Sequence, residues 1–312
     1  MARQSRLGRR HRPGGPRLRP EPRGGLMAAD ELKRLHELPS LGGLFVKALA
    51  TGFNRPGPDA GLPSRSVVVE SLAQDPARLV AYNHVTGFGL RDHVPATWLH
   101  VQTFPLHAWL MAQADFPFPL AGTVHVSNEM TLHRPVTVAD KLWVRVTCNN
   151  LAPHKRGVSF DLVGEIRVGS EIVWTGTSTY LALGRKLPGT PVPAPRLEAP
   201  DVAASQLWRL PADLGRQYAQ VSGDTNPIHL SRLTAMPFGF KRAIIHGMWT
   251  HAKALSSLGP RLPGTHTVRV AFTKPISLPG RVRFAADDEL KFAVVNSDQS
   301  KAYLVGQVLP TQ

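Results

Sequence analysis

The residues best suited to chemistry gather in one segment, 218–252, in the last third of the chain. Asp224 and His229 lie five residues apart there, with Asn226 and Pro227 between them. A carboxylate and an imidazole on one loop can serve as general acid and general base when burial and neighbours tune their pKa values. Gly247, just before an apolar run, can present a free backbone N–H to an oxygen that gains negative charge. We therefore predict an acid/base site with an oxyanion donor.

The same residues also have a simpler, structural interpretation. Asp-x-Asn-Pro is a common turn whose side chains accept hydrogen bonds from loop amides, and a glycine allows two elements to pack closely. A glycine can do both, so Gly247 is compatible with either role. Whether Asp224 and Asn226 are catalytic or only stabilise a turn must be decided from the sequence around them.

Two helices are expected to position this loop. The first covers about 212–222 and ends at Gly223, because a proline after a polar residue favours a turn over a continuing helix. The second begins near His246 and Gly247 and runs through apolar residues to Leu258. Upstream, the patterns predict a helix at 28–38, a strand at 66–72 and a helix at 75–87 with Asp75 as its N-cap.

The chain contains an internal repeat. Three blocks recur in the same order with nearly the same spacing: 82–87 corresponds to 218–223, 104–114 to 243–254, and 132–146 to 272–286. Alternating apolar and polar residues predict four late strands in each half, at about 123–132, 140–149, 156–168 and 171–183, and at about 265–273, 281–287, 290–296 and 301–309. A central helix against a long antiparallel sheet in each half is an α+β arrangement.

The first half has lost the polar residues of the loop. Asp224 aligns with Phe88, Asn226 with Leu90 and Gly247 with Ala108, and only His93 falls where His229 stands. We therefore expect the first half to be catalytically inactive and to present an apolar surface where the second half is polar. Six apolar residues are expected mostly in the core and partly along a tunnel for an apolar group: Phe104, Trp109, Leu110, Met111, Phe116 and Phe118.

The run Y-x-x-V-S-G-D-x-N-P-I-H-L from Tyr218 to Leu230, followed by I-x-H-G-M from Ile244 to Met248, resembles the hydratase 2 motif of MaoC-like dehydratases. The resemblance covers about 203–312 directly and 65–185 through the repeat. It implies a double hot-dog fold and the activity of an (R)-specific enoyl-CoA hydratase or 3-hydroxyacyl-thioester dehydratase in fatty-acid metabolism. The implied substrate is a thioester of coenzyme A or acyl carrier protein, with no cofactor and no metal.

The resemblance also implies roles for single residues. Asp224 and His229 would form the catalytic pair, Asn226 would help to position them, and Gly247 would donate its N–H to the thioester carbonyl. Substrate-binding residues are expected at Ser222, which would also buttress the loop, and at Lys241, Arg242 and Met248. His246 aligns with His107 of the inactive half, which favours a structural role for both. Arg134 and Lys274 are equivalent cations near the site.

Composition limits the remaining classes. The net charge of +15 is concentrated partly in 1–26, where eight arginines stand against one acid, so we expect a disordered basic tail, with Met27 as a possible start, rather than a nucleic-acid site. A single cysteine, Cys148, excludes a disulfide framework and favours a reducing, cytoplasmic location. No apolar run is long enough for a membrane helix, so a membrane partner is not expected.

The domain prediction follows from these patterns. It places an N-terminal repeat at 27–185, a linker at 186–202 with five prolines within 186–200, and a C-terminal repeat at 203–312. The two repeats would form a pseudo-dimer within one chain, and a further homodimer is compatible with that. Two alternatives to a hydratase are a hot-dog thioesterase and a non-catalytic protein that binds acyl thioesters.

Overall fold

The computed structural model describes residues 31–44, 54–120, 122–191, 193 and 196–311. Residues 31–312 form one compact unit. The basic tail at 1–26 lies outside the described residues, so its predicted disorder is not tested. The division into repeats joined by a linker also stays a prediction.

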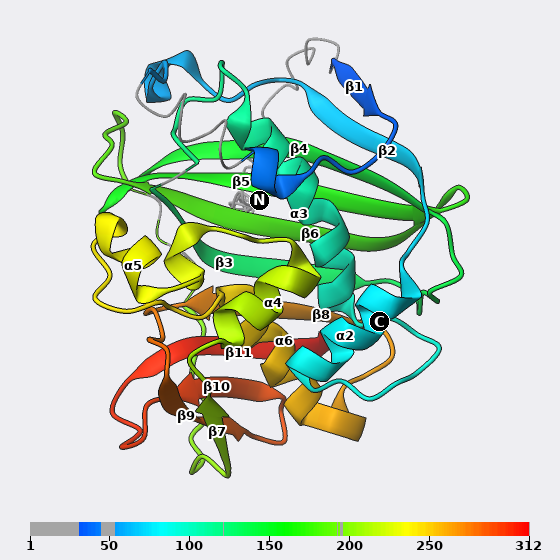
Figure 1. The fold of residues 1–312 in the computed structure, drawn as a ribbon, viewed down its shortest axis with the longest axis vertical. Helices are drawn as coiled ribbons and strands as arrows, with labels where there is room; N and C mark the ends of the chain where they lie inside the picture. Colours follow the sequence, from blue (N-terminus) through cyan, green and yellow to red (C-terminus); the bar gives the residue numbers. More distant parts are fainter. Residues whose placement is uncertain (1–30, 45–53, 121, 192, 194–195, 312) are drawn as a thin grey trace, which may run out of the picture. The chain divides into compact units, whose positions relative to one another are not determined.

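The described strands form one sheet of 11 strands in the order β1-β2-β4-β5-β6-β3-β8-β11-β10-β9-β7 (Figure 1). Strands β2 to β6 belong to the first repeat and β7 to β11 to the second. Their bounds are β1 Leu32–Leu35, β2 Ser66–Leu72, β3 Thr123–Leu132, β4 Leu142–His154, β5 Gly157–Val168, β6 Glu171–Leu183, β7 Gln206–Leu210, β8 His266–Phe272, β9 Gly280–Ala286, β10 Lys291–Val295 and β11 Ala302–Pro310.

The two repeats meet at the antiparallel pair β3 and β8, which runs from Ser127 opposite Ala271 to Leu132 opposite His266. Side chains reinforce this pairing across the junction. The Thr131 and Thr267 hydroxyls lie 2.8 Å apart, and Arg269 Nε donates to Glu129 Oε2 at 2.6 Å. The backbone ladder therefore joins the two halves into one continuous sheet.

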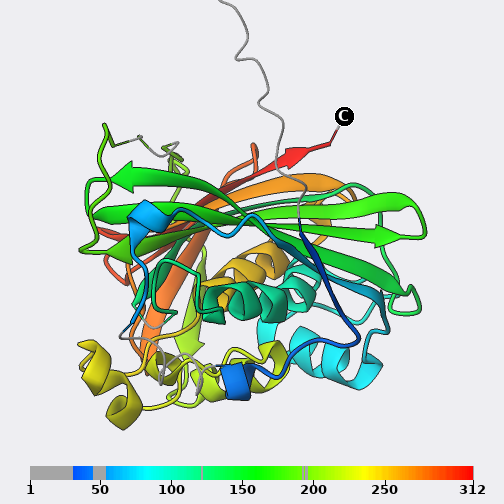
Figure 2. The same ribbon diagram turned by 90° about the horizontal axis from the view of Figure 1, so that it is seen from above.

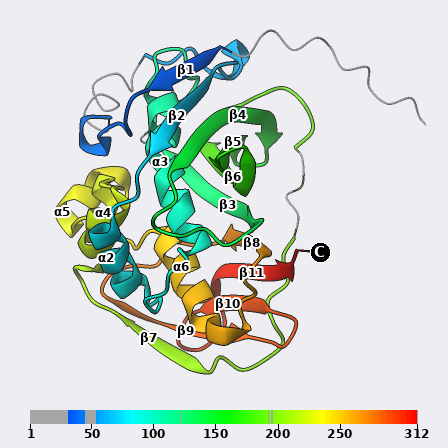
Figure 3. The ribbon, with the colours of Figure 1, turned by 90° about the vertical axis from the view of Figure 1, so that its right-hand side faces the viewer.

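Two central helices, α3 (Ala96–Ala112) and α6 (Gly247–Leu258), lie against the concave side of the sheet (Figure 2). Nearly every residue of α3 is buried, as expected for a helix that protein surrounds on all sides. In Figure 3, α3 and α6 lie between the sheet and a group of helices that contains α2 (Pro76–Thr86), α4 (Leu214–Ser222) and α5 (Arg232–Ala235). Four 3₁₀ turns lie at Pro58–Ala60, Pro227–His229, Met236–Phe238 and Gly259–Arg261, and residues 41–44 are also helical.

Helices of one repeat hydrogen-bond to helices of the other. Trp249 Nε1 on α6 donates to Val85 O on α2 at 2.9 Å, and Ser256 Oγ donates to Thr86 O at 2.8 Å. In the opposite direction, Arg78 Nε on α2 donates to Val221 O near the end of α4 at 2.7 Å. The first repeat thus holds the helix that leads into the predicted catalytic loop.

Most of the predicted elements are confirmed, including the helices on both sides of the loop and the eight late strands. Asp75 caps α2 as expected, accepting from the backbone N–H groups of Ala77 and Arg78. The predicted helix at 28–38 is wrong over Leu32–Leu35, which forms β1 and pairs in parallel with β2. A segment this short gains little from helical bonds, whereas the open edge of β2 offers a row of partners. Within the described residues, no helix is long and apolar enough to span a membrane.

Candidate active site

A cavity of about 700 Å³ contains most of the predicted site residues. Asp224, Asn226, His229 and Gly247 of the second repeat form part of its wall, and Ser222 and Met248 line it as well. The first repeat contributes lining residues from α3, β3 and β6. The fold therefore brings residues from both repeats, which are far apart in the sequence, to one cavity.

The loop that carries Asp224 begins where α4 ends. Gly223 adopts a left-handed conformation with φ of 80°, which glycine reaches without strain, and terminates the helix. Ser222 Oγ donates to Tyr218 O at 2.8 Å and accepts from the Asp224 N–H at 3.2 Å. Ser222 therefore links the end of α4 to the start of the loop, which is compatible with the predicted buttressing role, and its contact with substrate stays a prediction.

The Asp-x-Asn-Pro segment is a turn, as its structural interpretation requires. Asp224 Oδ1 accepts from the Asn226 N–H at 3.2 Å, and Asn226 Oδ1 accepts from the Ile228 N–H at 3.3 Å. The second of these bonds caps the 3₁₀ turn that presents His229. Asn226 thus positions His229 through the backbone, and the turn leaves Asp224 Oδ2 outside this bonding.

His229 is held in one orientation. Its Nδ1 donates to Ile244 O at 2.8 Å, so the proton is on Nδ1 and the lone pair of neutral His229 is on Nε2. Ile244 is itself fixed because its N–H donates to Ile228 O at 3.1 Å. The ring is buried yet lines the cavity, so Nε2 is the ring atom available for a proton from a bound molecule.

Burial moves the pKa values of the pair toward each other. Removal from water raises the pKa of Asp224, and the neighbouring His229 and the Asn226 N–H partly oppose this shift. Removal from water lowers the pKa of His229, opposed by Asp224 and by the bond to Ile244. Converging pKa values make proton transfer between the two groups and a shared water easier in both directions.

His246 contacts both members of the pair. Its ring stacks on that of His229 with centroids 3.6 Å apart, and its Nε2 donates to the backbone oxygen of Asp224 at 2.9 Å. The same Nε2 lies 3.8 Å from Asp224 Oδ2. Burial holds the pKa of His246 well below its usual range, so the ring is neutral. These contacts fix the loop and fit the predicted structural role.

Asp224, His229 and His246 are also residue types that bind metals, and one ligand atom of each lies within 4.8 Å of the others. However, His229 Nδ1 and His246 Nε2 already donate to carbonyl oxygens. The planes of the two stacked rings are only 26° apart, so their lone pairs, which lie in those planes, do not converge on one point close to both rings. The arrangement therefore suits acid/base chemistry better than a tetrahedral metal site.

Gly247 is the first residue of α6, so its N–H has no helical carbonyl one turn earlier to bond. A Cβ atom at this position would come within 3.0 Å of the Phe272 ring. Close packing therefore requires a small residue here, and the free N–H at the helix start can still act as a donor. Both interpretations of Gly247 fit the geometry.

The predicted cations fall in different places. Lys241 and Arg242 are exposed and do not line the cavity, so their contact with substrate stays a prediction. Lys274 and Arg156 do line it. Arg134, the equivalent of Lys274, instead donates to Glu171 at 2.6 Å. Arg156 was not identified from the sequence; the structure places it in the turn between β4 and β5.

Phe88, Leu90 and His93, which the sequence aligns with Asp224, Asn226 and His229, do not line the cavity. The predicted alignment of Gly247 with Ala108 is wrong, because Gly247 is the first residue of α6, whereas Ala108 lies near the end of α3, whose first residue is Ala96. Of the six apolar residues considered for a tunnel, Phe104 and Met111 line it, and the other four pack in the core.

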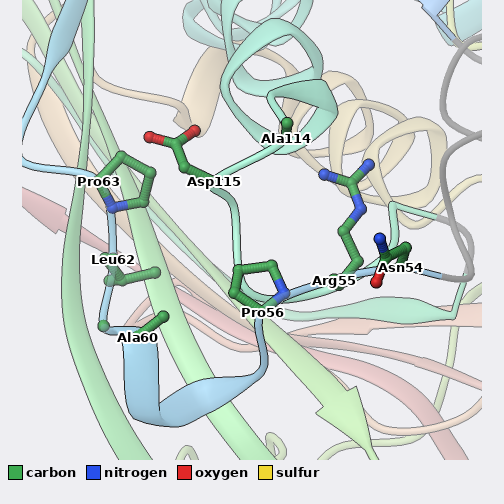
Figure 4. A pocket seen from close by; sticks show the side chains of 9 residues that line it. Asn54, Arg55, Pro56, Ala60, Leu62, Pro63, Ala114 and Asp115 are labelled. Carbon is green, nitrogen blue, oxygen red and sulfur yellow. The ribbon is translucent and has the colours of Figure 1, made fainter.

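A second cavity, of about 430 Å³, lies between the segment 54–63 and the end of α3 (Figure 4). Its charged groups are Arg55 and Asp115. Arg55 donates to Gln113 O, and Asp115 pairs with Arg65. It contains no acid/base pair, so we assign the chemistry to the larger cavity.

Comparisons with known proteins agree with this assignment. A family model described as "MaoC like domain" matches residues 195–306. The 3-hydroxyacyl-thioester dehydratase X of Mycobacterium tuberculosis is 39% identical over 219 residues, which are 70% of this chain and 78% of that protein. The crystal structure of HtdX from the same organism has a TM-score of 0.70 at 32% identity and covers 79% of this chain and 100% of that one.

A structure of a MaoC-like dehydratase from Phytophthora capsici has a TM-score of 0.67 at 17% identity, with 81% of this chain and 97% of that chain covered. At this identity the similarity concerns the fold alone. Together with the M. tuberculosis structure, it confirms the predicted α+β double hot-dog fold.

Proposed function

Because the chain belongs to the MaoC-like dehydratase family, we propose that its larger cavity catalyses the reversible addition of water to trans-2-enoyl thioesters, as a hydro-lyase. The observation that carries the proposal is the placement of Asp224 and His229 on one loop of the cavity, beside the start of α6. The (R) configuration of the 3-hydroxyacyl product is part of the proposal.

Gly247, Asp224 and His229 have different roles in the proposed reaction. The thioester carbonyl accepts from the Gly247 N–H, where the helix dipole stabilises the negative charge that develops on the oxygen. Asp224 and His229 Nε2 hold one water between them and remove a proton from it as its oxygen bonds to C3. The pair then returns a proton to C2, so that one water is added and the side chains end in their starting states.

The rest of the cavity supports an acyl thioester as substrate. Phe104 and Met111 provide apolar surface for the acyl chain, and Lys274 and Arg156 provide charge for the phosphates of coenzyme A or of a carrier-protein arm. The reaction requires no cofactor. A cytoplasmic location is supported by the presence of a single cysteine, Cys148, in the chain.

The test measures hydration of a chain-length series of trans-2-enoyl-CoA substrates, and the decrease in enoyl absorbance reports the rate. Asp224→Asn and His229→Ala are each expected to lower kcat/KM by about a hundred-fold to ten-thousand-fold, since each removes a proton-transfer group. His93→Ala is the control, because His93 aligns with His229 in the sequence, is exposed and lies outside the cavity. It should keep wild-type activity.

Wild-type turnover in both folded site variants would contradict the proposal. Release of free thiol from saturated acyl-CoA would identify a thioesterase instead. Binding of acyl-CoA without hydration of any enoyl substrate would indicate a non-catalytic binding protein.

A further inference from the structure

Three polar aromatic residues of the first repeat line the same cavity, and the proposed reaction uses none of them. They are His100 on α3, His125 on β3 and Tyr180 on β6, and we refer to them together as the polar wall. The His125 ring stacks on Tyr180 with centroids 4.8 Å apart and on His100 with centroids 6.1 Å apart. The three side chains therefore form one contiguous cluster.

The polar wall contains hydrogen-bonding atoms that the protein leaves unpaired. His100 Nδ1, His125 Nε2 and the Tyr180 hydroxyl each have less than 1 Å² of accessible surface and have no hydrogen-bond partner among the described residues. Folded proteins pair nearly all such atoms, because an unpaired one keeps its desolvation penalty. All three belong to side chains that line the cavity, so a rotation of these rings when a molecule fills the cavity would supply the partner.

The polar wall is uncharged at neutral pH. Burial lowers the pKa of His100 to about 4, and burial together with the neighbouring histidines holds the pKa of His125 well below its usual range. Burial also raises the pKa of Tyr180. Neutral imidazole and phenol groups both donate and accept hydrogen bonds, which suits a hydroxyl or carbonyl oxygen; a carboxylate or phosphate would require cations.

The polar wall lies close to the site of the proposed reaction. The Phe272 ring lies against Gly247, and its centroid is 5.0 Å from that of His125. The polar wall is therefore one aromatic ring away from the predicted donor to the thioester carbonyl. Apolar lining residues of the same repeat, Phe104 and Met111, share this part of the cavity.

We propose that the polar wall binds a hydroxyl or keto oxygen on the acyl chain, so that the preferred substrates are oxygenated acyl thioesters. This inference rests on the proposed function only in that the cavity holds an acyl thioester. A fully apolar chain would leave all three polar atoms unpaired, whereas an oxygen at the matching carbon would pair with at least one of them.

The test compares binding of unreactive ligands, so that its readout does not depend on hydration. Octanoyl-CoA is titrated calorimetrically against its ω-hydroxy analogue and its analogue with a ketone at the penultimate carbon, and the comparison is repeated with shorter and longer chains. The best oxygenated ligand is expected to have a Kd at least about five-fold below that of its plain counterpart, as one net hydrogen bond provides.

Two variants locate the effect and a third controls for it. Tyr180→Phe and His125→Phe should bring the ratio of Kd values close to one. Tyr82→Phe is the matched control, because Tyr82 is fully buried but does not line the cavity, and it should keep the wild-type ratio.

Plain and oxygenated ligands that bind wild-type protein equally at every chain length would overturn the inference. An equal loss of preference in Tyr82→Phe and Tyr180→Phe would overturn it as well. If the protein hydrates enoyl-CoA but shows no preference for oxygenated ligands, only the proposed role of the polar wall is refuted. If it prefers oxygenated ligands but hydrates no enoyl thioester, the proposed reaction is refuted and the role of the polar wall is supported. Failure of every acyl-CoA to bind refutes both.

Discussion

Gly247→Ala separates the two roles that the structure allows for this glycine. The added methyl group would lie 3.0 Å from the Phe272 atoms Cδ1 and Cε1, closer than ordinary carbon contact, so the ring or the helix start must shift. Overpacking of this kind destabilises a core by about 1–3 kcal/mol. For a protein of this size we expect the Tm to fall by about 2–4 °C for each kcal/mol. The start of the equivalent helix tolerates alanine, because Ala96 is the first residue of α3.

The activity loss has a separate origin. If the Gly247 N–H approaches the thioester carbonyl, the methyl group obstructs that approach, and kcat should fall by up to about a hundred-fold to a thousand-fold, the effect of losing an oxyanion donor. The decisive comparison is Gly247→Ala in a Phe272→Leu background, measured against Phe272→Leu alone, because the smaller side chain removes the clash. We expect stability to recover and kcat to stay low. Recovery of both kcat and Tm would refute the donor role and leave only the packing role.

Two further predictions concern stability and positioning. His251 on α6 is fully buried, neither of its ring nitrogens has a hydrogen-bond partner in the part of the chain that the structure describes, and burial lowers its pKa to about 3. Its folded pKa lies below the unfolded value of about 6.5, so its contribution to stability is present above that value and is lost as the pH falls; near pH 5 the loss is about 2 kcal/mol. Urea unfolding of His251→Leu should therefore show a shallower decline between neutral pH and pH 5 than the wild type, and parallel curves would contradict this. Arg78 holds the end of α4 through its bond to Val221 O, and its guanidinium carbon lies 5.6 Å from the centroid of the Trp98 ring. Arg78→Met should therefore lower kcat about ten-fold at nearly constant KM, and Arg78→Lys should have an intermediate kcat. A lower Tm with an unchanged kcat would exclude this positioning role.

Local patterns in the sequence were sufficient for most elements of the fold. Gly223 and Asn226-Pro227 fix the end of α4, and the alternating strands of each half follow from residues within a few positions of one another. The strand β1 was missed because its conformation is imposed by a partner, β2, more than thirty residues later in the chain. Local propensity carries no information about such a pairing.

The candidate site divides in a similar way. The sequence identified Asp224, Asn226, His229 and Gly247, since their types and spacing are themselves the signal. It did not identify Arg156 or the polar wall, whose residues come from α3, β3, β6 and the turn after β4. These side chains are spread over about eighty residues of sequence, and only the curvature of the sheet around α3 and α6 brings them to one cavity.

The sequence by itself determined the repeat, the order of elements and the loop 218–230, because each depends on the spacing of nearby residues. Tertiary structure decided three further properties. Burial sets the directions in which the pKa values of Asp224 and His229 move, the Phe272 ring limits the space at Gly247, and the sheet places His125 and Tyr180 in the wall. Each of these depends on which distant atoms exclude water or touch one another, and spacing along the chain does not encode that.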